Sequence, residues 1–416
     1  MVGGPGAVFW MWIIAFFGMM TNYSENVLGI YYRRRNEKGE WSGGAMYYLQ
    51  DGLGGKKGFK TIGKILAVIF SFFAMLASFG IGSMGQVNKI VINVESAFPI
   101  SKLENTIVFG EANLYQIILG IAIMILVALI VLGGLKRIAN FAEKVVPFMI
   151  VLFVAGSFII IGINYANIIP AFKAIFVNAF KPVAALGGGV GFVISTVMTQ
   201  GFKRGVFSNE AGLGSSVMVH SNSNVKEPVK QGMWGIFEVF ADTMIVCTMT
   251  ALVVLTSGVY DLATGQIAEG TSDATLVASA FNQFFPWGGI GAKFIAVAMF
   301  LFAFTTVLGW SHYGSKAWEY VFGAKTTVIF KIIHVITTVF GAVLSSSLAW
   351  DISDTFNGLM MIPNLIGVIV MSGMVMKITK NYIDRKKRGL KVEPILSYDP
   401  KTQAEQVAKM KEDGEI

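Results

Sequence analysis

The sequence predicts an all-α, polytopic membrane protein that forms one transmembrane domain over residues 1–416. The chain is 54% hydrophobic and only 14% charged, with a mean hydropathy of +0.63, which is too apolar for an ordinary soluble domain. It contains nine uncharged runs of 18 to 28 residues, each close to the roughly 20 residues that cross a bilayer as a helix. Its Lys and Arg residues are concentrated in every second connection between these runs. We therefore expect about nine transmembrane helices.

The nine runs follow one another along most of the chain. Buried helices of a soluble protein would need much shorter apolar runs. The single cysteine, Cys247, lies inside a run, so an intramolecular disulfide framework is excluded. Four helices are expected within residues 5–163 and five within 187–378, followed by a tail over 379–416. The runs are 1–24, 65–88, 112–135, 145–172, 182–202, 243–260, 294–315, 332–350 and 355–376.

The Lys and Arg residues predict the orientation of these helices. Every second connection is basic, whereas the connections between them are poor in Lys and Arg, so the positive-inside rule places the N-terminus outside and the C-terminal tail in the cytoplasm. The net charge of +8 thus reports topology rather than nucleic-acid binding. The basic connections carry Arg33, Arg34, Arg35, Lys38, Lys56, Lys57 and Lys60; Lys136, Arg137 and Lys144; Lys203, Arg204, Lys226 and Lys230; and Lys316, Lys325 and Lys331.

The fifth run ends in the stretch GFKRGVFSNEAGLGSS, residues 201–216. Glycine costs about 1 kcal/mol per helical position relative to alanine, so this cluster predicts an interrupted helix. An interruption at membrane depth is tolerated where the freed backbone groups line a cavity or bind a ligand. The alternative is a cytoplasmic loop with its own short helix, which Ser208 or Asn209 would cap with Glu210 in the first turn.

The helix order favours a functional interruption. Secondary transporters are often built from two inverted repeats, with substrate held between discontinuous helices at corresponding positions. The last five helices would form one repeat, but residues 5–163 supply only four. The sequence therefore predicts that one core helix, the counterpart of the interrupted fifth helix, is missing before residue 1. The chain as printed would then lack half of its binding site and would not be a competent transporter.

Five blocks of the sequence resemble the alanine/glycine:cation symporter family, which has the leucine-transporter (LeuT) type of inverted-repeat fold. They are spread in order over nearly the whole chain, so their combined match is more specific than any single motif. Family members usually have two helices before the first block, which agrees with the helix order above. The blocks are GGPGAVFWMWIIAFFGMMTNYSE (3–25), WSGGAMYY (41–48), RGVFSNEAGLGSS (204–216), FAFTTVLGWSHYG (302–314) and DTFNGLMMIPNLIG (354–367).

The resemblance implies a set of substrate-binding residues. The fifth helix is similar to the family's unwound substrate helix, and a half-helix beginning at Ser208–Glu210 would offer backbone N–H groups to a carboxylate. Gln86 and Trp310 have structural alternatives, an interhelical hydrogen bond and packing respectively. The candidates are Gln86, Gly205, Phe207, Ser208, Asn209, Gly212 and Trp310.

The resemblance also implies a sodium site at Thr305 and Thr306. In LeuT-like symporters, such a pair of hydroxyl residues holds Na⁺ together with carbonyl groups of the first core helix. Oxygen ligands suit a hard cation. Threonine hydroxyls also commonly bond back to their own helix, which is the structural alternative.

The expected function is sodium-coupled import of a small neutral amino acid, alanine or glycine, by alternating access in the cell membrane. Coupling to H⁺ instead of Na⁺ is the less favoured version. No P-loop, HExxH or GxSxG motif supports an ATP-driven or enzymatic function. The expected partners are the amino acid, the cation and membrane lipid. An ion channel or a non-transporting amino-acid sensor remains as the alternative, because interrupted helices also build selectivity filters.

Overall fold

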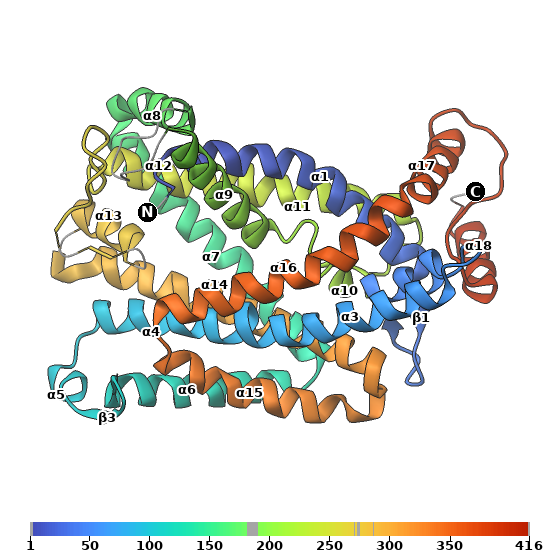
Figure 1. Ribbon diagram of the computed structural model, residues 1–416, viewed down its shortest axis with the longest axis horizontal. Coiled ribbons are helices and arrows are strands. Elements are labelled where there is room, and N and C mark those ends of the chain that lie inside the picture. Colours follow the sequence, from blue (N-terminus) through green and yellow to red (C-terminus); the bar gives the residue numbers. More distant parts are fainter. Residues whose placement is uncertain (1–2, 181–189, 270, 273–274, 286, 415–416) are drawn as a thin grey trace.

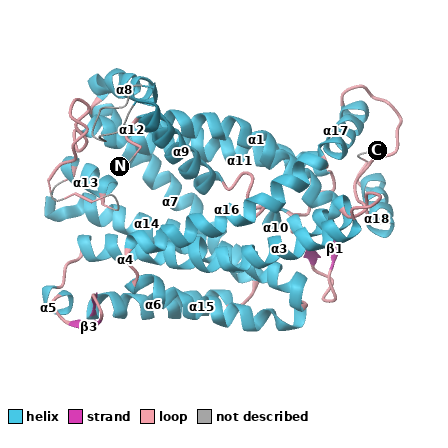
Figure 2. Cartoon of the chain, in the orientation of Figure 1, coloured by secondary structure: helices cyan, strands magenta, loops and turns pink. Residues whose placement is uncertain are grey.

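The computed structural model describes residues 3–180, 190–269, 271–272, 275–285 and 287–414. Helices dominate this part of the chain, and its four short strands form two hairpins (Figure 2). One hairpin pairs β1 (Arg34–Arg35) with β2 (Trp41–Ser42), and the other pairs β3 (Ile107–Phe109) with β4 (Ala112–Asn113). Eight of the described helical segments are long and apolar enough to cross a membrane, which confirms the all-α, polytopic prediction.

The first half of the chain supplies four of these eight segments, close to the first four predicted runs. The second of them is continuous from Lys60 to Ala97 because a π-helical turn joins two α-helices. The elements are α1 (Gly6–Tyr32), α2 (Ala45–Tyr47), η1 (Tyr48–Leu53), α3 (Lys60–Phe79), η2 (Gly80–Met84), α4 (Gly85–Ala97), α5 (Ser101–Glu104), α6 (Leu114–Val131), α7 (Leu135–Ile163), η3 (Tyr165–Asn167) and α8 (Ile168–Phe180).

The second half supplies the other four, together with α9, which covers part of the predicted run 182–202. Residues 182–189 of that run, with the glycines at 187–189, lie outside the described residues. The elements are α9 (Val190–Asn209), α10 (Val217–His220), α11 (Pro228–Val239), η4 (Phe240–Cys247), α12 (Thr248–Ser257), α13 (Leu276–Phe284), η5 (Trp287–Gly289), α14 (Ile290–Phe322), η6 (Ala324–Thr326), α15 (Thr327–Val343), α16 (Ser346–Val370), α17 (Ser372–Lys386) and α18 (Pro400–Glu412).

The interruption after the fifth run is real, but it lies later than predicted. Helix α9 continues through Lys203 and Arg204 to Asn209, so these two basic residues belong to a helix and not to a connecting loop. The chain leaves the helix at Glu210, whose φ is 57°, and turns through Gly212 at φ +92° before α10 begins. A left-handed φ is uncommon for a residue with a side chain and is often retained at functional sites. Neither proposed role of Ser208 and Asn209 as a helix start is correct, because the two residues end α9.

The helices run roughly parallel along the long axis of the molecule (Figure 1). Helix α1 packs against both α9 and α11, while α6 pairs with α15 along the opposite edge. The segment α3–α4, together with α14 and α16, lies between these two groups. The largest hydrophobic cluster fills the space where these elements meet and includes Leu28, Phe70, Trp310 and Phe330, each with at most 1% of its surface exposed.

The C-terminal segment is attached to the end of the bundle where α1 ends (Figure 1). The Arg385 guanidinium of α17 donates to both carboxylate oxygens of Glu227 at the start of α11, at 2.7 and 2.9 Å. Both side chains are buried, at 5% and 1% exposure. The Tyr398 amide donates to the Tyr31 carbonyl of α1, at 2.9 Å. The tail is thus part of the folded bundle.

Candidate functional site

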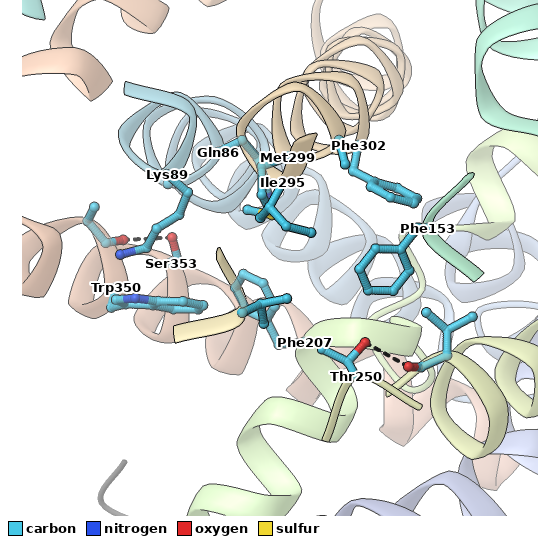
Figure 3. A pocket seen from close by; sticks show the side chains of 15 residues that line it. Gln86, Lys89, Phe153, Phe207, Thr250, Ile295, Met299, Phe302, Trp350 and Ser353 are labelled. Carbon is cyan, nitrogen blue, oxygen red and sulfur yellow. Dashed lines mark hydrogen bonds between the residues drawn. The ribbon is translucent and has the colours of Figure 1, made fainter. Parts of the chain in front are cut away.

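A cavity of about 440 Å³ lies between α4, α7, α9, α14 and α16, next to η4 and α12. Its volume falls within the roughly 300–1,000 Å³ typical of small-molecule sites. Figure 3 shows the lining side chains around one space, with Lys89, Trp350 and Ser353 on one side and Phe153 and Thr250 on the other. The lining is mainly apolar. It consists of Gly85, Gln86, Lys89, Phe153, Phe207, Val246, Thr250, Val277, Ile295, Ala298, Met299, Phe302, Ala349, Trp350 and Ser353.

Two π-helical turns position the polar side chains of this cavity. Segment η2 ends immediately before α4, whose first two turns present Gln86 and Lys89 three residues apart on one face. Segment η4 ends immediately before α12, which presents Thr250. Such turns break the regular helical register and frequently occur at functional sites. The Thr250 hydroxyl donates to the Val246 carbonyl at 2.8 Å, so its oxygen can accept a further hydrogen bond.

An aromatic and charged cluster closes one side of the cavity. The rings of Phe207 and Trp350 have centroids 4.8 Å apart. The Arg204 guanidinium lies over the Trp350 ring, 4.1 Å from its centroid, and donates to the Asp354 carboxylate at 2.6 Å. The ion pair and the stacking hold α9 and α16 together beside the cavity. The pairing also explains why α9 can carry an arginine beside a mainly apolar cavity.

The structure brings two of the predicted substrate residues together and places three others elsewhere. Gln86 and Phe207 both line the cavity. The Ser208 hydroxyl instead donates to Asp242 at 2.6 Å, and the Asn209 amide donates to the Thr243 hydroxyl at 3.0 Å. Gly205 allows close packing between α9 and α1, because a Cβ there would lie 2.4 Å from Ile14 Cγ2.

The remaining substrate candidates also lie away from the cavity lining. The Trp310 side chain is 1% exposed and packs against Gly82, where an added Cβ would lie 2.3 Å from Trp310 Cβ. This contact agrees with the packing alternative for Trp310. The Gly212 carbonyl accepts a hydrogen bond from the Asn364 side chain at 2.8 Å, so it ties the interruption to α16.

The predicted sodium ligands lie one turn beyond a cavity residue. The hydroxyls of Thr305 and Thr306 both donate to the Phe302 carbonyl, at 2.8 and 3.0 Å, while Phe302 itself lines the cavity. This is the backbone bonding expected of the structural alternative. It occupies the hydroxyl hydrogens and leaves oxygen lone pairs that can face a cation.

The sequence analysis missed the other polar lining residues. Lys89 lines the cavity and carried a usable signal, because a charge inside an apolar helix is a functional candidate by default. Arg204, which lies beside the cavity on α9, carried the same signal. Thr250 and Ser353 had no distinguishing sequence feature, since hydroxyl residues are common in membrane helices and bond to their own backbone. The Ser353 hydroxyl does so, donating to the Ala349 carbonyl at 2.7 Å.

A polytopic helical bundle with an interrupted helix beside a small, mainly apolar cavity defines the class of membrane transporters. The chain belongs to the sodium:alanine symporter family, whose model matches residues 1–395. It is therefore a transporter of the cation-coupled amino-acid type and not an enzyme. This finding confirms the resemblance drawn from the five sequence blocks.

Individual relatives cover most of the chain. It is 40% identical to the sodium/alanine symporter AgcS of Methanococcus maripaludis over 393 residues, which is 94% of this chain and 80% of the relative. It is 33% identical to the amino-acid carrier protein AlsT of Bacillus subtilis over 391 residues, which is 93% of this chain and 76% of the relative. It is 30% identical to the uncharacterized transporter YaaJ of Escherichia coli over 402 residues, which is 96% of this chain and 78% of the relative.

Proposed function

We propose that this protein is a sodium-coupled symporter that imports alanine or glycine across the cell membrane, with its C-terminus in the cytoplasm. The observation that carries the proposal is the convergence of Gln86 and Phe207 on one small cavity in a chain of this family. The name of the relative AgcS, a sodium/alanine symporter, supports alanine as the first substrate to test.

The chemistry of the cavity suits a small zwitterion. Gln86, Lys89 and Ser353 offer polar groups and a positive charge on one side, and Thr250 offers a hydroxyl near the other. A carboxylate is favoured near the Lys89 ammonium, while a methyl group or hydrogen would meet the apolar wall. The Phe207 and Trp350 rings, with centroids 4.8 Å apart, form part of the cavity wall. This combination of polar and apolar walls suits a neutral zwitterion such as alanine or glycine.

The coupling ion would bind near Thr305 and Thr306, whose hydroxyl oxygens can still coordinate a cation. Sodium is favoured over a proton because two hydroxyl oxygens are ligands for a hard metal ion and do not titrate in the physiological range. One Na⁺ entering down about 100 mV releases about 2.3 kcal/mol. A tenfold gradient adds about 1.4 kcal/mol. Together these terms would accumulate a neutral amino acid by several hundred-fold.

Uptake of labelled alanine and glycine into proteoliposomes tests the proposal. In a version of the chain extended upstream of residue 1, we expect saturable accumulation with an inward Na⁺ gradient and none with K⁺. Ohmic conductance without accumulation would favour a channel, and binding without accumulation would favour a sensor. Because the helix order predicts one missing core helix, the printed chain is compared with an upstream-extended version. Equal uptake by both would contradict the helix count.

The double variant Thr305→Ala with Thr306→Ala tests the sodium site. We expect a rise in the Na⁺ concentration for half-maximal uptake, with a smaller change in the alanine concentration for half-maximal uptake. Thr355→Ala is the matched control, because the Thr355 hydroxyl makes the same kind of backbone bond from an exposed position on α16. An unchanged Na⁺ activation curve in the double variant would refute the assignment.

A further inference from the structure

A buried carboxyl group on α1 has no role in the cavity described above. The Glu25 side chain is fully buried, at 0% exposure, and its Oε1 accepts a hydrogen bond from the Asn364 amide of α16. Its Oε2 is buried and has no hydrogen-bond partner. The backbone amides of Gly212 and Gly214 face the carboxyl group without completing a hydrogen bond to Oε2.

Among the residues that the structure describes, no positively charged group acts on Glu25. The Tyr48 hydroxyl donates to Asn364 Oδ1, so a chain of hydrogen bonds runs from η1 through α16 to α1. The charged group that acts on Glu25 is Glu210, at the start of the interruption after α9. Glu210 in turn accepts from the Ser215 hydroxyl at 2.7 Å and is faced by Trp310 and Tyr313 of α14.

The more distant groups that act on Glu210 are two further carboxyls, and one of them, Glu238, pairs with His220 at 2.8 Å. Glu238 of α11 and Asp242 of η4 both act on Glu210. Among the described residues, no Lys, Arg or His side chain forms a salt bridge with Glu25 or Glu210. Two uncompensated carboxylates in one buried site would be unfavourable by many kcal/mol, and such groups gain a proton or a cation instead. Because two neighbouring carboxylates repel each other, carboxyl groups in such a pair often share one proton.

A proton fits this site better than a metal ion. Sodium needs several oxygen ligands arranged around one point, whereas Glu25 Oε2 is the one side-chain oxygen among those of Glu25, Asn364, Tyr48 and Ser215 that is buried without a hydrogen-bond partner. One unpartnered oxygen, Glu25 Oε2, is enough for a proton. We propose that Glu25 is a proton-binding site, and that its proton is exchanged when the interruption at 210–216 rearranges against α1 and α16.

The site couples three parts of the fold. Asn364 binds both Glu25 and the Gly212 carbonyl, at 2.8 Å for the second contact, so it links α1 to the interruption. A neutral Glu25 can stay in this apolar contact, whereas an ionised Glu25 beside Glu210 would push the interruption away. Acidic pH is therefore expected to favour the packed arrangement seen here, and alkaline pH to favour its release.

Infrared spectroscopy of the purified full chain at neutral pH tests the proton directly. We expect a carbonyl band of a protonated carboxylic acid that shifts in D₂O and upon ¹³C-glutamate labelling. The band should be lost in Glu25→Gln, move in Glu25→Asp and persist in Glu405→Gln, a control whose carboxylate pairs with Lys409 on α18. Absence of the band in the unsubstituted chain, or its persistence in Glu25→Gln, would overturn the proton site. Where Glu25→Gln fails to fold, the conservative Glu25→Asp variant keeps the assignment testable, because only a band that belongs to residue 25 moves in it.

The exchange is tested by adding Na⁺ and alanine, and this step alone rests on the proposed function. We expect the band to decrease by at least half with both ligands, and to be unaffected by K⁺ and alanine. Failure of uptake with the glutamate band present would count against the proposed function while supporting the proton site. An unchanged band in protein that transports alanine would overturn the exchange.

Discussion

The buried ion pair between Glu227 and Arg385 allows a quantitative test of how the C-terminal segment is held. Arg385→Met removes the cation and leaves Glu227, at 1% exposure, without its two hydrogen bonds. Breaking a buried pair from one side costs about 3–5 kcal/mol, because the remaining charge stays buried. Glu227→Leu should cost a similar amount, reduced by the bond that Arg385 keeps to Asn381 at 3.0 Å. The double variant should lose far less than the sum, since well-packed apolar side chains often replace such a pair at little cost.

The assay is denaturant unfolding in detergent, followed by tryptophan fluorescence, on the chain and its variants. Arg388→Met is the control, because Arg388 pairs with Asp384 from a side chain that is 62% exposed. Exposed helical pairs contribute only about 0.3–0.5 kcal/mol. A loss below about 1 kcal/mol in Arg385→Met, or a double variant as unstable as the sum of the single variants, would refute the reasoning.

Three further outcomes follow from other parts of the structure. Trp310→Phe should lower the free energy of unfolding by about 1–3 kcal/mol, because Trp310 packs on Gly82 outside the cavity lining. Inhibition of alanine uptake by serine, valine and leucine should stay unchanged, and altered inhibition would contradict this packing role. Phe207→Ala removes a cavity wall, so inhibition of alanine uptake by valine should strengthen about tenfold; unchanged inhibition would place the substrate elsewhere. Asp399→Ala should cost α18 about 1 kcal/mol as a lost N-cap, seen as faster hydrogen exchange. Hydrogen bonds from Thr402 lower the pKa of Asp399, so the stabilisation of α18 by this carboxylate is present above the unfolded-state pKa and is lost as the pH falls through the lowered, folded-state pKa. Hydrogen exchange in α18 that changes neither in Asp399→Ala nor at acidic pH would refute the cap.

Much of the fold was predictable because a bilayer imposes a length on apolar segments. Eight of the nine uncharged runs correspond to membrane-length helices. The end of α9 was missed because Lys203 and Arg204 resemble the basic flank of a membrane helix. Their partner, Asp354, lies 150 positions away from Arg204 in sequence. A charge inside a helix is only interpretable once its counter-charge is known.

The candidate site was predictable only in part. Gln86 and Phe207 were found through the resemblance, and both line the cavity. Ser208 and Asn209 follow Phe207 directly, but successive helical residues point about 100° apart. They therefore face Asp242 and Thr243 rather than the cavity. Sequence similarity pointed to a segment that reaches the cavity at Phe207, whereas the direction of each side chain depends on packing between distant helices.

The π-helical turn η2 rotates the side chains of α4 about the helix axis relative to those of α3. A π turn accommodates one residue more than an α turn, and one residue corresponds to about 100° of rotation around the helix axis. Deleting one residue within 80–84 would restore regular α-helix and turn all of α4 relative to α3. Gln86 and Lys89 would then leave the cavity together, although neither had been changed. The sequence of α4 would be unchanged, yet its side chains would face a different direction and the polar side of the cavity would be lost.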